Sequence, residues 1–326
     1  MNHYRKWLLY VLVLSLLLGG ALEVNYRLCP APLRHYVDFK AQLLSQTNNR
    51  RYRALLLGDS VFRNVADRFH RHPDVLDLSS NANVSLAGNF FLLQRFFQNN
   101  NHAENVFLFF DPDLLTSNLR SNMSYSYFTT VFNRPEEVRM IESLHRHDLF
   151  THNDWGYKRL AAFKRLFQPC YLPAVPVFLD SQPTHLETAL TNRVALIIQN
   201  RIHRSYSDFS PIAATYLRKM AELCRVHHCS LTLVLEPLPE SFYPYFLRSP
   251  LMTRLDNFVC DHNLSLMDAN TFLIFKDAAF IDGFHLKKNW RYRFARLINR
   301  NIVNIFPTEP CPSPQQLTQY VPVSKP

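Results

Sequence analysis

Three side chains able to carry out nucleophilic catalysis occur in two short motifs. Ser60 closes the tripeptide Gly58-Asp59-Ser60, which follows the apolar run 54–57 and precedes a segment of helical composition, 61–69. A serine at such a strand-to-helix turn lies where open α/β sheets bind ligands, and the first helical turn presents N–H groups to a developing oxyanion. Taken alone, the tripeptide is equally typical of a turn in which Asp59 or Ser60 caps the next helix.

The second motif is the segment 280–286, Phe-Ile-Asp-Gly-Phe-His-Leu, which follows the last predicted strand. Asp282 and His285 are three residues apart, so one loop can hold both of them. Asp282 can then accept a hydrogen bond from one imidazole nitrogen, while the other nitrogen takes a proton from Ser60. The alternative is a helix cap at Asp282 with a surface histidine beside it. The presence of both motifs, in this order, favours a Ser60–His285–Asp282 triad.

Alternating apolar runs and helical segments predict the scaffold that would bring the two motifs together. Strands are predicted over 54–57, 75–78, 106–110, 231–235 and 264–267, and helices over 36–44, 61–69, 86–97 and 211–227. The run 106–110 is apolar throughout, as expected for a parallel sheet covered on both faces. The alternation predicts an α/β protein with a doubly wound sheet.

The two motifs resemble the first and last sequence blocks of the SGNH (GDSL-type) hydrolase superfamily, Gly-Asp-Ser and Asp-x-x-His. The resemblance covers residues 53–306 and implies a flavodoxin-like three-layer sandwich with a central parallel sheet. It also implies that Ser60 is the nucleophile, that His285 is the general base and then the acid, and that Asp282 orients the ring. This chemistry requires no metal and no organic cofactor.

The middle blocks depart from the family's pattern. In the family, a glycine after the second strand and an asparagine after the third strand help to bind the oxyanion. Here the segment 78–88 has no glycine at its start, which makes Asn83 and Ser85 the candidate donors. Asp111-Pro112-Asp113 follows the third strand in place of the amide. Because losing one oxyanion donor costs about two to three orders of magnitude in rate, we expect a substitute group or a slow, specialised transferase.

The N-terminal segment is expected to enter a membrane. Arg5 and Lys6 precede the uncharged run 8–22, and the segment 7–24 is about 18 residues long, which suits both a bilayer span and a signal peptide. A small-x-small cleavage site is not clear, so a retained anchor is preferred. The basic residues before the run predict a single-pass protein whose catalytic domain is extracytoplasmic.

These features divide the chain into four regions: an anchor or signal segment (1–24), a connector (25–52), an SGNH-like domain (53–306) and a flexible tail (307–326). The domain carries a helical, aromatic-rich insertion over about 115–192. Its aromatic side chains are interpreted as core residues, with some as candidates for a carbohydrate-facing wall: Tyr125, Tyr127, Trp155 and Tyr157.

Charge and metal-binding residue types point to no further site. The net charge of +10 suits an anionic partner, but the basic residues are scattered, which argues against nucleic acid. Six cysteines fit an oxidising compartment, and Cys224 and Cys229 are interpreted as a local disulfide or as buried thiols rather than zinc ligands. The three histidines of the segment 145–152 are interpreted as surface or cap residues.

The layout of an anchor, Gly-Asp-Ser, an altered third block and Asp-x-x-His resembles that of extracytoplasmic SGNH acyltransferases. These include the D-alanyl transfer protein of lipoteichoic acid synthesis and the alginate acetylation proteins. The resemblance implies acyl transfer through Ser60 to a cell-envelope glycan or polymer, beside a membrane-bound O-acyltransferase that supplies the acyl donor. The alternatives are an esterase or deacylase with the same triad, and a noncatalytic scaffold that binds an anionic polymer.

Overall fold

The structure is a computed structural model, and it describes most of the predicted domain. The described residues are 4, 6–7, 9–15, 17, 20, 36–66, 73–80, 85–116, 131–132, 134–137, 139–140 and 185–304. The chain divides into two compact units, one of residues 36–144 and 182–326 and the other of residues 1–35 and 145–181. The helices and strands named below all belong to the first unit.

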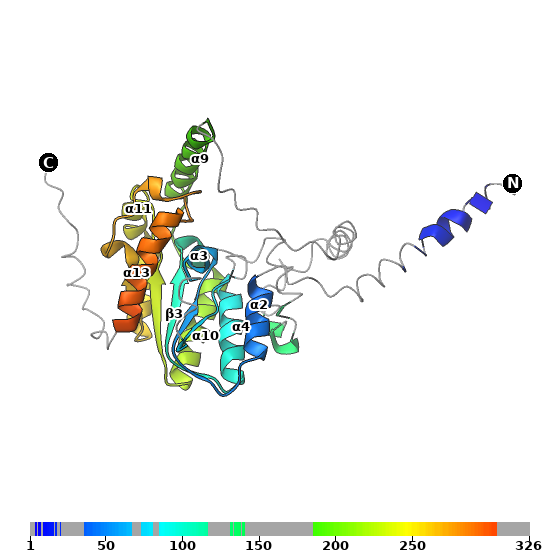
Figure 1. Cartoon of the computed structure of the whole chain (residues 1–326), viewed down its shortest axis with the longest axis horizontal. Coiled ribbons are helices and arrows are strands. Elements are labelled where there is room, and N and C mark those ends of the chain that lie inside the picture. The colour runs from blue at the N-terminus through cyan, green and yellow to red at the C-terminus, as the bar shows by residue number, and fades with distance from the viewer. Residues whose placement is uncertain are drawn as a thin grey trace. The chain divides into compact units, whose positions relative to one another are not determined.

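Five parallel strands form one sheet in the order β2-β1-β3-β4-β5. In Figure 1 the labelled strand β3 lies between helices on either side. The strands are β1 (Arg51–Leu57), β2 (Val75–Asp77), β3 (His102–Phe110), β4 (Ser230–Leu235) and β5 (Ser265–Asp268). From β1 the chain moves to β2 on one side and then returns to β3 on the other side. Ligands bind open α/β sheets where the strand order reverses in this way, at the carboxyl ends of the strands. The ends of β1 and β3 therefore mark the place for a site.

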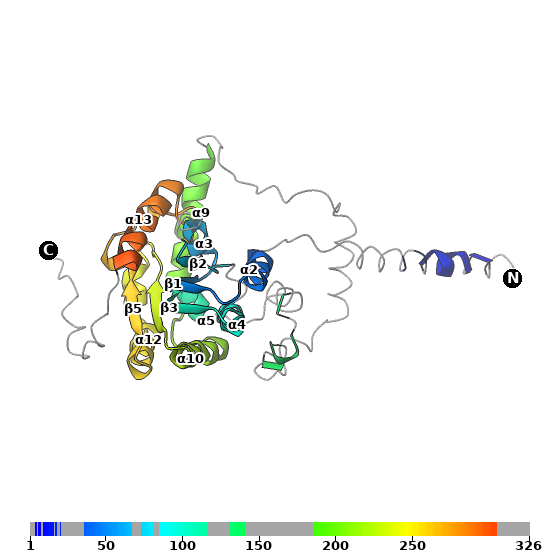
Figure 2. The ribbon, with the colours of Figure 1, turned by 60° about the horizontal axis from the view of Figure 1, so that its bottom comes forward.

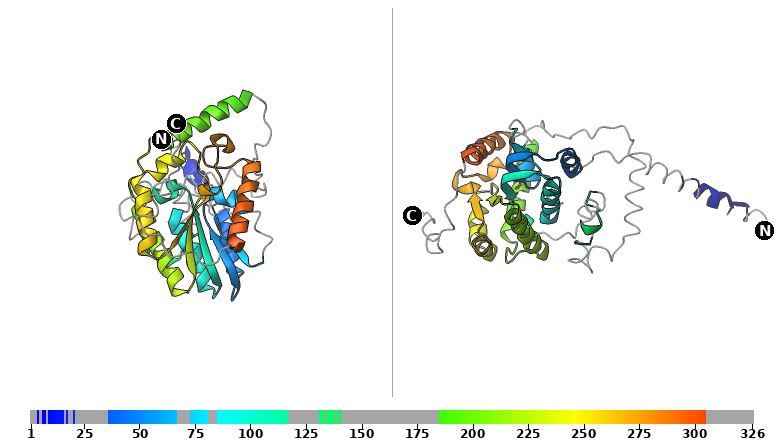
Figure 3. Two further views of the ribbon diagram at one scale, coloured as in Figure 1. Left: turned by 90° about the vertical axis from the view of Figure 1, so that its left-hand side faces the viewer. Right: turned by 90° about the horizontal axis from the view of Figure 1, so that it is seen from below.

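Helices cover both faces of the sheet, as Figure 2 and the view from below in Figure 3 show. One face carries α3 (Ser60–Ala66) and α13 (Lys288–Asn304), and the other carries α4 (Ser85–Gln98), α10 (Pro211–Val226) and α12 (Pro250–Asp261). The remaining elements are α2 (Tyr36–Ser45), α5 (Pro112–Thr116), α9 (His185–Ile202), α11 (Tyr243–Leu247), η2 (Ala269–Thr271) and η3 (Asp277–Ala279). The molecule thus has the predicted α/β class, with a central parallel sheet between two layers of helices.

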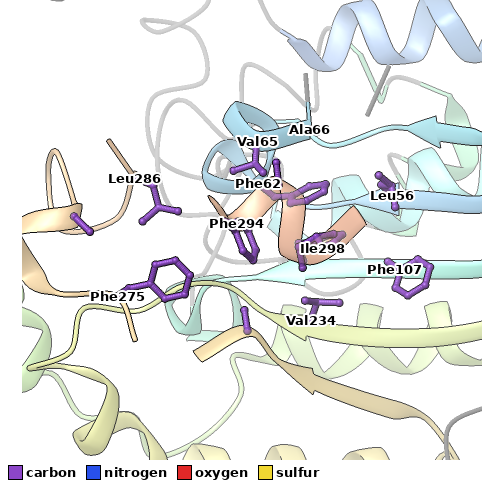
Figure 4. Packing of buried hydrophobic residues seen from close by; sticks show 14 of the residues in the cluster. Leu56, Phe62, Val65, Ala66, Phe107, Val234, Phe275, Leu286, Phe294 and Ile298 are labelled. Atoms are coloured by element: carbon purple, nitrogen blue, oxygen red, sulfur yellow. The ribbon is translucent and has the colours of Figure 1, made fainter. Parts of the chain in front are cut away.

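The hydrophobic core on the α3 and α13 face joins side chains of these helices to the sheet, as Phe62, Phe294, Ile298 and Phe107 show (Figure 4). Phe62 of α3 stacks on Phe109 of β3, with ring centroids 3.4 Å apart. A Cβ atom on Gly58 would lie 3.0 Å from the Cβ of Phe109 and 3.1 Å from its carbonyl oxygen. The turn at Gly58 therefore needs glycine because it packs this closely on β3.

The other face is held together by aromatic packing and by a buried ion pair. Arg95 of α4 forms two hydrogen bonds of 2.7 Å with the carboxylate of Glu137 and one of 2.8 Å with the carbonyl of Val131. Phe91 of α4 packs on Phe132, with centroids 5.3 Å apart. The described residues of the predicted insertion near position 135 are thus packed on α4.

A second buried ion pair anchors α2 at the carboxyl end of β2. Lys40 is almost fully buried and donates to the carboxylate and the carbonyl oxygen of Asp77. Asp77 also accepts a 2.8 Å hydrogen bond from the backbone N–H of Ser79. The helix predicted over 36–44 within the connector is therefore part of the folded unit, as α2.

Several predicted elements differ from the observed ones at their ends. The segment 51–53, assigned mainly to the connector, is the start of β1, and β3 begins four residues before the predicted position. The helix predicted over 61–69 is described from 60 to 66. Helix α9 begins at His185, inside the range of the predicted insertion, and α12 and α13 were not predicted. The rest of the insertion, including its candidate carbohydrate-facing aromatics and the histidines of 145–152, lies mainly outside the described residues.

The N-terminal anchor stays a prediction. In the described part of the chain, no helix has both the length and the apolar character needed to cross a bilayer. The range 1–24 is only partly described, and the tail 307–326 lies outside the described residues.

The cysteines Cys224 and Cys229 are thiols, and the Cys229 thiol donates to the carbonyl oxygen of Cys224 over 3.4 Å. The alternative of a local disulfide is therefore wrong, and the alternative of a buried thiol is confirmed for Cys224. Cys260 is disulfide-bonded.

Candidate active site

The structure brings the three predicted catalytic residues into one chain of hydrogen bonds. Ser60 is the first residue of α3, immediately after β1, and its Oγ lies 3.1 Å from Nε2 of His285. Nδ1 of the same imidazole lies 2.7 Å from Oδ2 of Asp282. These distances allow a proton to pass from the serine hydroxyl to an imidazole that a carboxylate orients. The catalytic roles of the three residues stay predictions.

The loop that carries Asp282 and His285 is fixed by its own backbone. Oδ1 of Asp282 accepts hydrogen bonds from the N–H groups of Phe284, at 3.1 Å, and His285, at 2.8 Å. The N–H of Ile281 donates to the carbonyl of His285 over 2.8 Å and closes the loop. Gly283 has φ +81°, a conformation that favours glycine, and a Cβ atom there would lie 3.0 Å from Cγ2 of Ile197 in α9. The sequence Asp-Gly-Phe-His is therefore suited to this turn.

The carboxylate of Asp282 is ionised at neutral pH. Burial opposes its ionisation, but the hydrogen bond and charge of His285, together with the N–H groups of His285 and Phe284, lower its pKa to about 2. An ionised Asp282 favours the imidazole tautomer with its proton on Nδ1. Nε2 then presents a lone pair to the Ser60 hydroxyl.

Asp59 caps α3 next to the candidate nucleophile. Its side chain is buried, and Oδ1 accepts a 2.7 Å hydrogen bond from the N–H of Val61. Capping and the triad were alternatives for the Gly58-Asp59-Ser60 sequence, and the structure contains both the cap and the Ser60–His285 contact. The aspartate therefore shapes the turn that presents Ser60.

Asn89 of α4 binds the Gly58-Asp59-Ser60 turn, and the sequence did not predict this contact. Its Oδ1 accepts a 3.2 Å hydrogen bond from the N–H of Gly58, and its Nδ2 donates to the carbonyl of Ser85 over 3.0 Å. It is completely buried in the first part of α4. Asn89 therefore links the start of α4 to the turn before Ser60, a role with no local sequence signal.

The two candidate oxyanion residues are only partly placed. Asn83 lies outside the described residues. Ser85 is buried, has φ +52°, and uses its Oγ to accept a 3.2 Å hydrogen bond from the N–H of Ala87. Its side chain thus caps α4, and an oxyanion role for either residue stays a prediction.

Carboxyl groups follow β1, β3 and β4 below the site. Asp59 follows β1, Asp111 follows β3 and Glu236 follows β4, and all three side chains are buried. Among the residues that the structure describes, neither carboxyl oxygen of Glu236 has a hydrogen-bond partner. Burial, with the charges of Asp59 and Asp111, raises the pKa of Glu236 well above its ordinary value. Burial thus disfavours the ionised form of Glu236.

The carboxylate of Asp111, directly after β3, is paired with an arginine. Burial raises the pKa of Asp111, and Arg201 opposes that rise through hydrogen bonds of 2.7 and 2.8 Å to the two oxygens. Asp111 is therefore paired with a cation, although its charge still raises the pKa values of Asp59 and Glu236. In the described part of the chain, no group of three or more His, Cys, Asp or Glu side chains could hold a metal ion.

Asp59 should make the stability of the protein depend on pH. Burial, followed by the charge of Asp111, raises its pKa to about 6 from 3.8. The folded state binds this proton more tightly than the unfolded state, so stability falls as the pH rises from about 4 to about 6 and stays lower above that range. We expect Asp59→Asn, which keeps a carbonyl acceptor for Val61, to be more stable than the parent at pH 7 by at most about 3 kcal/mol.

Urea unfolding at pH 4, 5, 6 and 7 would measure this difference, which should shrink toward pH 4. Asp208→Asn is the matched control, because the Asp208 side chain is 55% exposed and should show no such trend. A difference between Asp59→Asn and the parent that stays constant over this pH range would contradict the prediction.

Comparisons with known proteins add likenesses of fold at low similarity. No family model matches the chain, and no curated protein matches it. A provisionally named acylhydrolase from Bacteroides fragilis is 9% identical, with 81% of this chain and 94% of that chain covered and a TM-score of 0.38. A protein provisionally named as a platelet activating factor, from Streptococcus pneumoniae, is 10% identical, with 90% and 99% covered and a TM-score of 0.36. Likenesses this weak say nothing about activity, which has to be inferred from the site.

Proposed function

We propose that this protein is a serine-dependent enzyme of the SGNH type that transfers an acyl group through an acyl-Ser60 intermediate. The observation that carries the proposal is the hydrogen-bonded chain from Ser60 Oγ to His285 Nε2, at 3.1 Å, and from His285 Nδ1 to Asp282, at 2.7 Å. A helix cap with a neighbouring surface histidine would not require this contact between residues that are 225 positions apart.

The proposed reaction has two halves with opposite proton transfers. Ser60 Oγ attacks the acyl carbonyl while His285 Nε2 takes the hydroxyl proton, and the imidazolium then protonates the leaving group. In the second half, the oxygen of an acceptor hydroxyl attacks the acyl-serine and gives its proton to His285, and Ser60 regains a proton as the acyl group leaves. The N–H of Ser60, at the start of α3, is the proposed donor to the oxyanion.

The acceptor is proposed to be a hydroxyl of a cell-envelope glycan or polymer. This is supported by the resemblance in layout to extracytoplasmic acyltransferases, including the altered block at Asp111. A membrane-bound O-acyltransferase is the proposed partner that supplies the acyl group. Hydrolysis by the same triad is the second candidate, since water and a sugar hydroxyl can attack the same intermediate.

The nucleophile can be tested with an activated-serine reagent. We expect a fluorophosphonate probe to label Ser60 in the purified protein, because His285 can remove the hydroxyl proton. Ser60→Ala should abolish labelling, whereas Ser205→Ala, which changes an exposed serine, should leave it unchanged. Equal labelling of Ser60→Ala and the parent would remove the assignment, and no labelling of the parent would favour the scaffold alternative.

Transfer and hydrolysis are separated by how the acyl-enzyme partitions. With an activated acetyl ester as donor and increasing amounts of a soluble oligosaccharide, a transferase should form acetylated sugar at the expense of free acetate. A constant yield of acetate would favour the esterase alternative.

Membrane attachment is proposed from the basic residues Arg5 and Lys6 before the uncharged run 8–22. A reporter enzyme that works only outside the cytoplasm should be active when it is fused after Asn49. The protein should stay in the membrane fraction after carbonate extraction. A shortened protein in the extracytoplasmic soluble fraction would instead show that the segment is a cleaved signal.

A further inference from the structure

Arg201 of α9 joins the end of a central strand to the loop that carries the proposed triad. The side chain is 1% exposed. Its Nη2 donates to both carboxylate oxygens of Asp111, after β3, and its Nη1 donates to the carbonyl oxygen of Gly283 over 3.1 Å. Gly283 lies between Asp282 and His285 in the chain. The Arg201 guanidinium therefore holds the middle of the loop that carries both residues, which we call the triad loop. Figure 3 shows α9 lying across one end of the sheet.

Two aromatic rings hold the plane of the guanidinium. Its central carbon lies 4.2 Å from the ring centroid of Phe242 and 4.3 Å from that of Phe284. Phe242 is completely buried, and Phe284 directly precedes His285. Arginine suits this position because its planar group can stack on rings while it binds a carboxylate with two hydrogen bonds. Lysine would keep the charge but lose the stacking and the paired geometry.

We propose that Arg201 is a positioning residue: it couples the triad loop to β3 and thereby sets the distance between His285 and Ser60. The inference rests on the proposed function, and it assigns a role to the carboxylate that stands in place of the family's amide. Asp111 holds Arg201, and Arg201 holds Gly283. The guanidinium itself contacts none of the three triad side chains in the described hydrogen bonds, so it acts through the loop.

The chain supplies a matched control three residues further on. Arg204 pairs with Oδ1 of Asp113 over 2.9 Å, and its side chain is 54% exposed. A change at Arg204 therefore alters an arginine–aspartate pair in the same region without removing the bond to the triad loop.

The test compares Arg201→Lys with Arg204→Lys in the full chain. The rate constant for fluorophosphonate labelling of Ser60 and the final labelled fraction are measured separately. We expect Arg201→Lys to label completely but about 10- to 100-fold more slowly, since a misplacement of about 1 Å can cost two orders of magnitude. Arg204→Lys should label at the parental rate. An effect on folding alone would lower the labelled fraction and leave the rate constant of the folded protein unchanged.

A second readout does not depend on catalysis. The Nδ1 proton of His285, identified by its loss in His285→Ala, should give a far-downfield proton resonance in NMR while it is bonded to Asp282. We expect this resonance to broaden or disappear in Arg201→Lys and to persist in Arg204→Lys. If the parent protein is not labelled, the proposed function fails, and the resonance still decides whether Arg201 positions the loop.

A third variant covers the case in which Arg201→Lys does not fold. Phe242→Leu removes one ring beside the guanidinium and leaves the ion pair with Asp111 intact. We expect it to slow labelling of Ser60 about 3- to 10-fold and to broaden the resonance of the His285 Nδ1 proton. Parental labelling rates and an unchanged His285 resonance in the folded variants would overturn the inference.

Discussion

Replacing both Ser60 and His285 by alanine should cost little more activity than replacing either one alone. Each single change is expected to lower the rate of acyl-enzyme formation from an activated ester by roughly 10⁴- to 10⁶-fold. Without His285, the hydroxyl 3.1 Å away has no base to take its proton, and without Ser60, the base has no hydroxyl to activate. Because both groups take part in the same proton transfer, either single change already abolishes it, and the second change has little further effect on the rate.

The measurement is a double-mutant cycle on the rate of ester cleavage, with His203→Ala as the control for an exposed histidine. The control should react at the parental rate. A double mutant whose loss equals the product of the two single losses would show that the residues act independently, and the triad would then be wrong.

Asp282→Asn should lower the same rate by about 10⁴-fold while the fold stays intact. Oδ1 of Asp282 accepts the N–H groups of Phe284 and His285, and Oδ2 faces Nδ1 of His285. An asparagine can keep the two backbone bonds only through its single carbonyl oxygen, which turns its NH₂ group toward Nδ1. The imidazole must then accept at Nδ1 and carry its proton on Nε2, where it cannot take the proton of Ser60.

A stability measurement shows whether Asp282→Asn loses activity because His285 carries its proton on the wrong nitrogen or because the protein unfolds. Asp282→Asn should still unfold in one cooperative transition in urea, at a somewhat lower midpoint, because the lowered pKa of Asp282 means that its ionised form stabilises the folded state. Asp261→Asn, at an exposed position, should change neither property. Near-parental activity of Asp282→Asn would show that the carboxylate does not orient the base.

The sheet and the proximity of Ser60, His285 and Asp282 were accessible from the sequence because both have local signals. The run 106–110 of β3 is apolar throughout, and the run 231–235 of β4 is apolar except for Thr232, which suits a sheet covered on both faces. Helix α13 has a weaker signal, because it buries Phe294 and Ile298 among arginine and asparagine residues on its other sides. Such a helix is recognised only once the surface that it covers is known.

Arg201 and Asn89 could not be found in this way because their partners are distant in the chain. Arg201 is 90 residues from Asp111, and Asn89 is 31 residues from Gly58. Asp111 gives part of the signal, since a carboxylate directly after a buried strand needs a cation nearby. Which arginine supplies it follows only from the packing of α9.

The distance along the chain between the proposed nucleophile and its proposed base determines when the candidate site is completed during protein synthesis. Ser60 leaves the ribosome 225 residues before His285, and the loop that contains Asp282 must then pass the strands β4 and β3 to reach the end of β1. A nascent chain that ends before position 282 therefore has the serine but neither its base nor the carboxylate that orients it. The proposed activity therefore requires that the last strand has joined the edge of the sheet, and we expect a chain that ends earlier to lack it.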